Sequence, residues 1–237
     1  MGEFQQQLLT LFGGLICLFT LVKCIRFLKC FSPHVWNALP QSFFRSMGEW
    51  AAYQCTGLWQ FTGLTLLSSL NDVKGQTSLA KRGLNIVMIS RTLEKLQKVA
   101  TEIEQATGRN VKIIQADFTK DYIYENIEEC LQGLEIGILV NNVGMLHNPL
   151  PCRFLNGADT DENLISCNIN SVTKMTRIIL KQMEPRQKGL ILNLSSGLGT
   201  FPCPLYTIYS ASKAFVCTFS KALQAEYKAK GIIIQVI

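Results

Sequence analysis

The chain has 237 residues, of which 48% are hydrophobic and 17% charged, and its formal net charge is +6 at pH 7. A chain of this length can bury one sizeable core as a single domain. Outside one N-terminal basic cluster the positive charges are spread out, which excludes a nucleic-acid-binding protein. The nine cysteines include no Cys-x-x-Cys pair, and His34 and His147 lie far apart, so we expect reduced thiols and no metal site.

The N-terminal segment is apolar enough to enter a membrane. Residues 8–22 are almost wholly apolar, and the basic cluster of Lys23, Arg26 and Lys29 follows them. Continued through Phe31, the segment can cross a bilayer if the basic side chains snorkel. Because the charge follows the apolar run and no cleavage site is evident, we expect an uncleaved anchor with the next domain on the cytoplasmic side. A buried core helix is the alternative.

After this anchor (residues 1–31) and a linker (residues 32–50), apolar strands alternate with amphipathic helices. The pattern predicts strands at 84–89, 111–116, 136–140, 190–194 and 232–237, and helices at 93–107, 123–131, 163–183 and 209–230. Gly108 is a suitable stop for the first of these helices. Continuous apolar strands that alternate with helices indicate an α/β fold whose doubly wound parallel sheet is Rossmann-like, the architecture that binds dinucleotides.

Three residues near the C-terminus form a candidate catalytic group. Tyr209 and Lys213 are four positions apart in a predicted helix, so both side chains project from one face. A nearby ammonium group favours the phenolate and lowers the pKa of a tyrosine, which makes the phenol usable in proton transfer. Ser196 follows the strand predicted at 190–194, at the carboxyl end where open α/β sheets bind ligands.

Further polar residues and a glycine follow the other predicted strands. Arg91 lies where a dinucleotide fold reads the adenosine ribose, and an arginine there accommodates the 2′-phosphate of NADP. Asp117 is placed to bind an adenine edge. The run Asn141-Asn142-Val143-Gly144 ends the next strand, where a glycine lets the backbone approach a ligand closely. Each of these residues alone could equally lie in a surface turn.

Together these residues resemble the short-chain dehydrogenase/reductase family. The resemblance covers residues 79–237 and rests on the Asn-Asn-x-Gly run, a helix asparagine at Asn168, a serine after the next strand, and Tyr-x-x-x-Lys. The surrounding sequence, such as Ser210-Ala211-Ser212-Lys213-Ala214-Phe215, is similar to that of the membrane-anchored 17-beta-hydroxysteroid dehydrogenases.

The resemblance implies a role for each residue. Tyr209 would protonate the steroid alkoxide as it forms, Lys213 would lower the pKa of Tyr209 and hold the nicotinamide ribose, and Ser196 would bind the substrate carbonyl. Asn168 would order a water that relays protons to Lys213. With Arg91 the cofactor would be NADPH, and the reaction would be reduction of a 17-ketosteroid, androstenedione to testosterone, at the endoplasmic reticulum membrane.

Two departures from the family pattern affect this expectation. Residues 51–78 stand where a first strand and a Gly-rich phosphate-binding turn are expected, and Phe61 occupies the position of the middle glycine. We therefore predict that the central strand is absent or improvised, and that Gly75 belongs to a turn. The chain ends at Ile237, so the last strand is expected to leave an apolar sheet edge exposed and the substrate pocket without one wall.

Two other functions stay open at this stage. A very-long-chain 3-ketoacyl-CoA reductase of fatty-acid elongation would share every motif quoted above. A catalytically inactive variant of the steroid reductase would keep the motifs and at most pair with other subunits. The long helices predicted at 163–183 and 209–230 resemble those through which the family forms homodimers.

Overall fold

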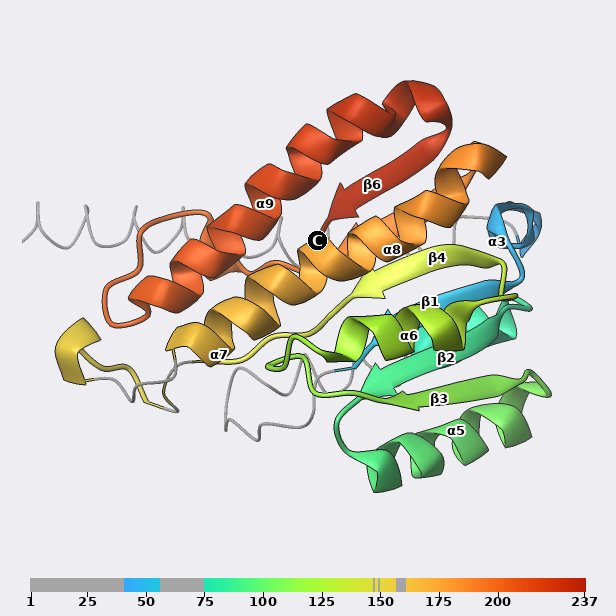
Figure 1. The fold of residues 1–237 in the computed structure, drawn as a ribbon, viewed down its shortest axis with the longest axis horizontal. Helices are drawn as coiled ribbons and strands as arrows, with labels where there is room; N and C mark the ends of the chain where they lie inside the picture. Colours follow the sequence, from blue (N-terminus) through green and yellow to red (C-terminus); the bar gives the residue numbers. More distant parts are fainter. Residues whose placement is uncertain (1–40, 56–74, 147, 149, 157–160) are drawn as a thin grey trace, which may run out of the picture. The chain divides into compact units, whose positions relative to one another are not determined.

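The computed structural model describes residues 41–55, 75–146, 148, 150–156 and 161–237 (Figure 1). The predicted anchor at residues 1–31 and the segment with Phe61 lie outside these ranges. In the part of the chain that is described, no helix has both the length and the apolar character needed to span a bilayer.

Six parallel strands form one sheet in the order β3-β2-β1-β4-β5-β6. The strands are β1 (Trp50–Gln54), β2 (Asn85–Ser90), β3 (Val111–Gln115), β4 (Ile136–Asn141), β5 (Gly189–Asn193) and β6 (Ile232–Val236). This order reverses direction between β1 and β4, which is the switch point of a doubly wound dinucleotide-binding sheet. The fold class predicted from the sequence is therefore confirmed.

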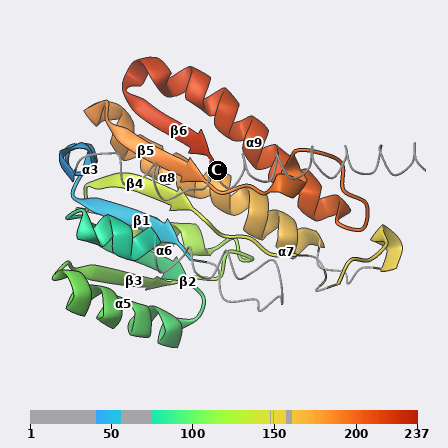
Figure 2. The same ribbon diagram turned by 180° about the vertical axis from the view of Figure 1, so that it is seen from behind.

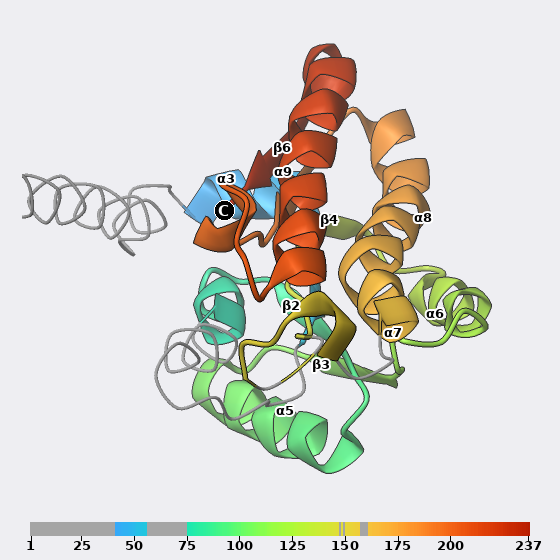
Figure 3. The same ribbon diagram turned by 90° about the vertical axis from the view of Figure 1, so that its left-hand side faces the viewer.

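Helices cover both faces of the sheet. Their bounds are α3 (Gln41–Met47), α5 (Leu93–Thr107), α6 (Ile123–Leu131), α7 (Asp161–Ile165), α8 (Ser171–Arg186) and α9 (Thr207–Tyr227). Helices α6, α8 and α9 lie on one side, and α5 and the helical residues 75–81 on the other (Figures 1, 2 and 3). Right-handed crossovers put successive helices on one face until the strand order reverses, which explains this division.

The central strand is present and is formed by β1 (Trp50–Gln54), which agrees with the second of the two predicted alternatives, an improvised strand. β1 pairs in parallel with both β2 and β4, and Ala51 and Ala52 are fully buried in it. Small apolar side chains fit a strand that is covered on both faces, so residues 51–54 complete the sheet without the sequence that is usual in the family. Gly75 was placed wrongly, because residues 75–81 are helical rather than part of a turn.

The helix predicted at 93–107 has these bounds in the structure. Leu96, Ala100 and Ile103 are its buried residues, spaced by four and three positions as one helix face requires. Gly108 ends the helix in the left-handed region, with φ 65°, and its N–H donates to the carbonyl of Glu104. Glycine adopts this conformation without the penalty that a Cβ imposes, so the predicted stop is confirmed.

The segment predicted as one helix at 163–183 is interrupted. A five-residue π-helical stretch, η2 (Ser166–Asn170), separates α7 from α8. A π-turn accommodates one extra residue and changes the direction of the side chains that it holds, and such turns concentrate at functional sites. Asn168 belongs to this stretch.

Strand β6 forms one edge of the described sheet and pairs with β5. Its Ile232 and Ile234 side chains are buried, and α9 packs on this strand. The expected sheet edge is therefore present, but the side chains of these two isoleucines are not exposed.

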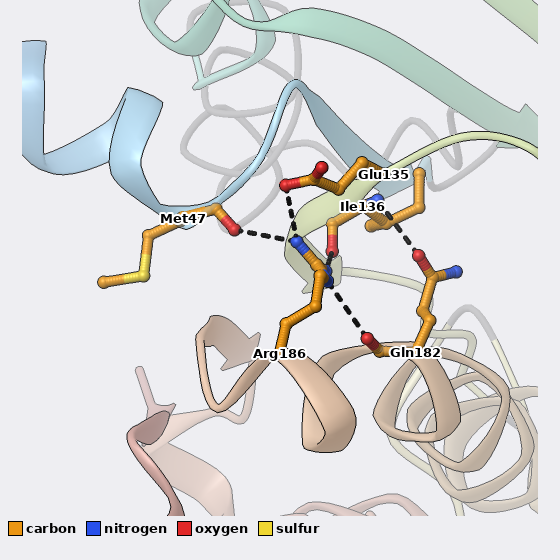
Figure 4. A network of polar contacts seen from close by, with 5 residues as sticks. All are labelled: Met47, Glu135, Ile136, Gln182 and Arg186. Carbon is orange, nitrogen blue, oxygen red and sulfur yellow. Dashed lines mark hydrogen bonds and ion pairs between the residues drawn. The ribbon is translucent and has the colours of Figure 1, made fainter.

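A polar network joins α3 to the amino end of the sheet, away from the carboxyl ends of the strands (Figure 4). The Arg186 guanidinium donates to the carbonyl oxygens of Met47 at 3.2 Å and Ile136 at 2.6 Å, and to Glu135 Oε1 at 2.8 Å. Gln182 Oε1 accepts from the Ile136 N–H at 3.0 Å. One side chain of α8 thus fixes α3 and the start of β4 together, which is a structural role.

Candidate active site

The carboxyl ends of the parallel strands meet at one edge of the sheet, and the predicted site residues gather there. A pocket open to solvent lies at this edge, over the ends of β1, β2, β3 and β4. Its lining residues are Cys55, Ser90, Arg91, Ala116, Asp117, Phe118, Thr119, Val143, Gly144, Met145 and Cys167. Because β1 and β4 flank the switch point, this pocket is where the fold would hold a dinucleotide.

Lys213 is held close to Tyr209, one turn further along α9. Its ammonium lies 5.8 Å from the centroid of the Tyr209 ring and donates a hydrogen bond to the Leu194 carbonyl oxygen at 3.1 Å. The side chain is buried, and loss of solvent lowers the pKa of Lys213 to about 8. The two side chains that the sequence placed on one helix face therefore do meet.

The Tyr209 phenol is half-buried, and Ser196 acts on its pKa. Burial raises the pKa of the phenol, and Ser196 opposes this by lowering it. The expected lowering by Lys213 is not what the structure gives, because the ammonium donates to a backbone carbonyl and desolvation dominates at the phenol. A phenol with this pKa is a proton donor at neutral pH.

Ser196 lies just beyond β5 and begins the short helix η3 (Gly197–Gly199). Its hydroxyl oxygen accepts a hydrogen bond from the Leu198 N–H at 3.3 Å, as an N-cap serine does. The same half-buried hydroxyl lowers the pKa of Tyr209. The roles predicted for this serine and tyrosine stay predictions.

Asn168 is fully buried and connects three parts of the site. Its Oδ1 accepts from the Met145 N–H at 2.8 Å, and its Nδ2 donates to the Met145 carbonyl at 3.0 Å and to Ser212 Oγ at 3.0 Å. Ser212 in turn donates to the carbonyl of Tyr209 at 2.7 Å. The side-chain amide therefore fixes the loop after β4 against the start of α9.

Gly144 separates the pocket from the catalytic group. A Cβ built on this residue would lie 3.3 Å from Lys213 Nζ and 3.8 Å from Asn168 Oδ1. This approach is tighter than most Cβ contacts, so a larger residue would press on the lysine. The close approach of a ligand to this glycine stays a prediction, and the nearest described neighbour of such a Cβ is Lys213.

Arg91 and Asp117 lie at the other end of the pocket. Arg91 follows β2 and its side chain is exposed, whereas Asp117 follows β3 and is half-buried. Asp117 Oδ1 accepts from both the N–H and the hydroxyl of Thr119, each at 3.0 Å. One carboxylate oxygen is thus engaged in a turn.

Asn141 was predicted to contact a cofactor, but its side chain points into the protein. Its Nδ2 donates to Asn193 Oδ1 at 2.7 Å and to Thr176 Oγ1 at 3.0 Å, and its Oδ1 accepts from Gln54 Nε2 at 2.7 Å. Asn193 then donates to Ser220 Oγ at 2.8 Å. This buried chain of hydrogen bonds links β1, β4 and β5 with α8 and α9, so the side chain of Asn141 has a structural role.

Sequence reasoning missed several pocket residues, among them Cys55, Ser90 and Cys167. Cys167 is buried, and burial raises the pKa of its thiol to about 12, against the lowering effect of Lys213 and Arg91. Its position directly before Asn168 was a signal that could have pointed to it. A thiol with this pKa stays protonated at neutral pH and is a poor nucleophile.

The described residues suit a nicotinamide dinucleotide. A free guanidinium at one end would meet a phosphate, and an ammonium and a phenol at the other end can donate to ribose hydroxyls. Gly144 leaves room between them where a Cβ would fill the space beside Lys213. The site thus has a cationic side chain at each end, Arg91 and Lys213, and little space beside Gly144 between them.

Comparison with known proteins agrees with this geometry. A family model described as short chain dehydrogenase matches residues 76–237. The 17-beta-hydroxysteroid dehydrogenase type 3 of Homo sapiens is 61% identical over 237 residues, which is 100% of this chain and 73% of that protein. The very-long-chain 3-oxoacyl-CoA reductase of Anas platyrhynchos is 52% identical over 161 residues, covering 66% of this chain and 51% of that protein.

Among solved structures, a short-chain dehydrogenase from Sphingobium yanoikuyae in complex with NADPH has a similar fold. It superposes with a TM-score of 0.64 at 28% identity and covers 78% of this chain and 69% of that one. These matches confirm the resemblance that the sequence motifs indicated.

Proposed function

Because the chain belongs to the short-chain dehydrogenase/reductase family of oxidoreductases, we propose that it reduces a 17-ketosteroid with NADPH, converting androstenedione to testosterone. The observation that supports this most directly is the buried Lys213 ammonium, which lies 5.8 Å from the centroid of the Tyr209 ring, with Ser196 just beyond β5. The 61% identity with a 17-beta-hydroxysteroid dehydrogenase supports the choice of a steroid.

In this proposal NADPH, when bound, supplies the hydride to the ketone carbon. Ser196 donates a hydrogen bond to the ketone oxygen and aligns it, and Tyr209 gives its phenolic proton to the oxygen as negative charge develops there. Lys213 binds the ribose, and its buried ammonium lies beside the phenol ring. Asn168 holds the start of α9 in place through Ser212.

The exposed guanidinium of Arg91 favours NADPH over NADH. Arg91 follows β2 at the mouth of the pocket, where a guanidinium can pair with the 2′-phosphate of the adenosine ribose. Asp117, at the end of the neighbouring strand, would contact the adenine edge through the carboxylate oxygen that Thr119 does not occupy.

An apolar substrate fits the surface beside Tyr209. Exposed apolar side chains occur in two loops, 150–156 and 200–206, and the second loop joins Ser196 to Tyr209. The Cys152 N–H donates to the Leu205 carbonyl at 3.3 Å and ties the two loops together. The exposed members are Leu150, Phe154, Leu155, Phe201 and Leu205.

We also propose that residues 1–31 anchor the protein in the endoplasmic reticulum membrane, where an apolar steroid concentrates. A homodimer would pair the long helices α8 and α9. The stacked rings of Phe215 and Phe219 on α9, 5.8 Å apart, offer an apolar contact for such pairing.

The test is an assay of the full chain in detergent with NADPH and androstenedione, with testosterone measured by chromatography. Very-long-chain 3-oxoacyl-CoA is assayed in parallel, because the identity with 3-oxoacyl-CoA reductases makes it the second candidate substrate. Steroid turnover that exceeds acyl-CoA turnover supports the proposal, and the reverse would replace it. NADPH binding, followed by cofactor fluorescence, with no turnover of either substrate would indicate an inactive variant.

A further inference from the structure

Two consecutive residues after β5 bind two different atoms of Lys213 on α9. The Leu194 carbonyl accepts from Lys213 Nζ at 3.1 Å, and Ser195 Oγ donates to the Lys213 carbonyl at 2.8 Å. Ser196, the next residue, lowers the pKa of the Tyr209 phenol. Leu194 thus holds a catalytic side chain, whereas the contact of Ser195 is to the helix backbone.

Ser195 is itself held from two sides. Its N–H donates to the Ile237 carbonyl at 2.7 Å, which fixes it to the chain beyond β6. The thiol of Cys217, one turn beyond Lys213 on α9, donates to Ser195 Oγ at 3.2 Å. The hydroxyl therefore accepts from one residue of α9 and donates to another.

The helix and the loop after β5 are in close contact at this point. A Cβ built on Gly199 would lie 2.7 Å from the Lys213 carbonyl carbon, so the loop backbone packs directly on the backbone of α9. Small sliding movements of α9 along this loop would move both Tyr209 and Lys213 relative to Ser196. A hydrogen bond to the Lys213 carbonyl opposes such sliding.

We propose that Ser195 is a positioning residue, which sets the place of Lys213 and Tyr209 relative to Ser196 by holding the Lys213 carbonyl. Cys217 assists by keeping the Ser195 hydroxyl oriented. The inference rests on the proposed function for its effect on turnover, but the position of the Tyr209 phenol can be measured without turnover.

The experiment uses the full chain in detergent with a fluorotyrosine at position 209, whose ¹⁹F signal reports ionisation at a lower pH than tyrosine itself. Ser195→Ala is expected to raise the titration midpoint of this phenol by about half a pH unit or more, because Ser196 lowers the pKa of the phenol. Ser195→Thr, which keeps a hydroxyl, should restore the midpoint. In the chain with its natural tyrosine, Ser195→Ala should lower kcat about tenfold with a smaller change in the KM for the ketone.

Ser220→Ala is the matched control. Ser220 Oγ also joins β5 to α9, since it accepts from Asn193 Nδ2 at 2.8 Å and donates to the Val216 carbonyl at 2.7 Å. Its loss should lower the melting temperature but leave the midpoint at position 209 unchanged.

A Ser195→Ala protein that melts earlier but keeps the wild-type midpoint would overturn the inference and leave Ser195 a purely structural residue. If that variant does not fold, Cys217→Ala decides, and an unchanged midpoint there likewise overturns it. A shifted midpoint in a chain that reduces no ketone would leave the positioning role standing and refute the proposed function instead.

Discussion

The ammonium of Lys213 donates to the carbonyl oxygen of Leu194 at 3.1 Å, although only 5% of this lysine is exposed. A buried ammonium loses its hydration, and one carbonyl replaces only part of it. Burial of the charged Lys213 therefore costs free energy of folding. Because only the protonated form has this cost, the stability of the protein depends on pH through this lysine.

Lys213→Met should reveal this cost. The pKa of Lys213 falls from 10.5 to about 8 on folding, so the unfolded chain binds more protons between these pH values and the free energy of unfolding rises with pH there. The stability advantage of the methionine variant should thus shrink by about 3 kcal/mol across this range. Urea unfolding of both proteins at several pH values measures the difference, and a constant gap would contradict the prediction.

Tyr209→Phe should abolish ketone reduction, with a loss of at least about a hundredfold, because it removes the phenol proposed to donate the proton. Folding and NADPH binding should be preserved, since the ring remains. Steady-state turnover and a cofactor fluorescence titration test the two halves separately. Turnover close to that of the wild type would show that another group donates the proton.

Arg91→Glu should move the cofactor preference from NADPH toward NADH, because a carboxylate repels the 2′-phosphate and can accept from a ribose hydroxyl. The ratio of kcat/KM for the two cofactors should change about tenfold or more, or about 1.4 kcal/mol. Lys98→Glu makes the same charge change at an exposed position of α5 and is the control. Equal ratios for both variants would mean that Arg91 does not read the phosphate.

Asn141→Ala should destabilise the protein by about 2–4 kcal/mol, because it leaves buried partners on β1, β5 and α8 without a hydrogen bond. The preference between NADPH and NADH should not change. Urea unfolding and the ratio of kcat/KM values measure the two effects. A stable variant with an altered cofactor ratio would instead support a direct contact with the cofactor.

Phe201→Ser should raise the KM for a steroid several-fold and leave that for NADPH unchanged, because its exposed ring belongs to the apolar loop that joins Ser196 to Tyr209. Tyr122→Ser removes another exposed aromatic ring, directly before α6, and serves as the reference. If both substitutions have the same effect on the steroid KM, the loop does not contact the substrate.

The local pattern of the sequence predicted the elements well where each segment has one strong signal. Leu93–Thr107 has regular helix spacing and a glycine stop, and its bounds were predicted correctly. The same pattern placed Ser196, Tyr209 and Lys213 at the site, because strand ends and helix faces follow directly from periodicity. For residues 51–54 the sequence left two alternatives open, since their place in the sheet depends on pairing with β2 and β4 and not on a local signal.

The sequence by itself therefore indicated most of the strands and helices and the candidate catalytic side chains, because strand ends and helix faces follow from local spacing. Only the tertiary structure decided where each polar group points. It turned the amide of Asn141 into the core, kept the pKa of Tyr209 high through burial, and brought Ser195 to the carbonyl of Lys213. Desolvation and hydrogen bonds between distant segments set these properties, and they exist only once the chain is packed.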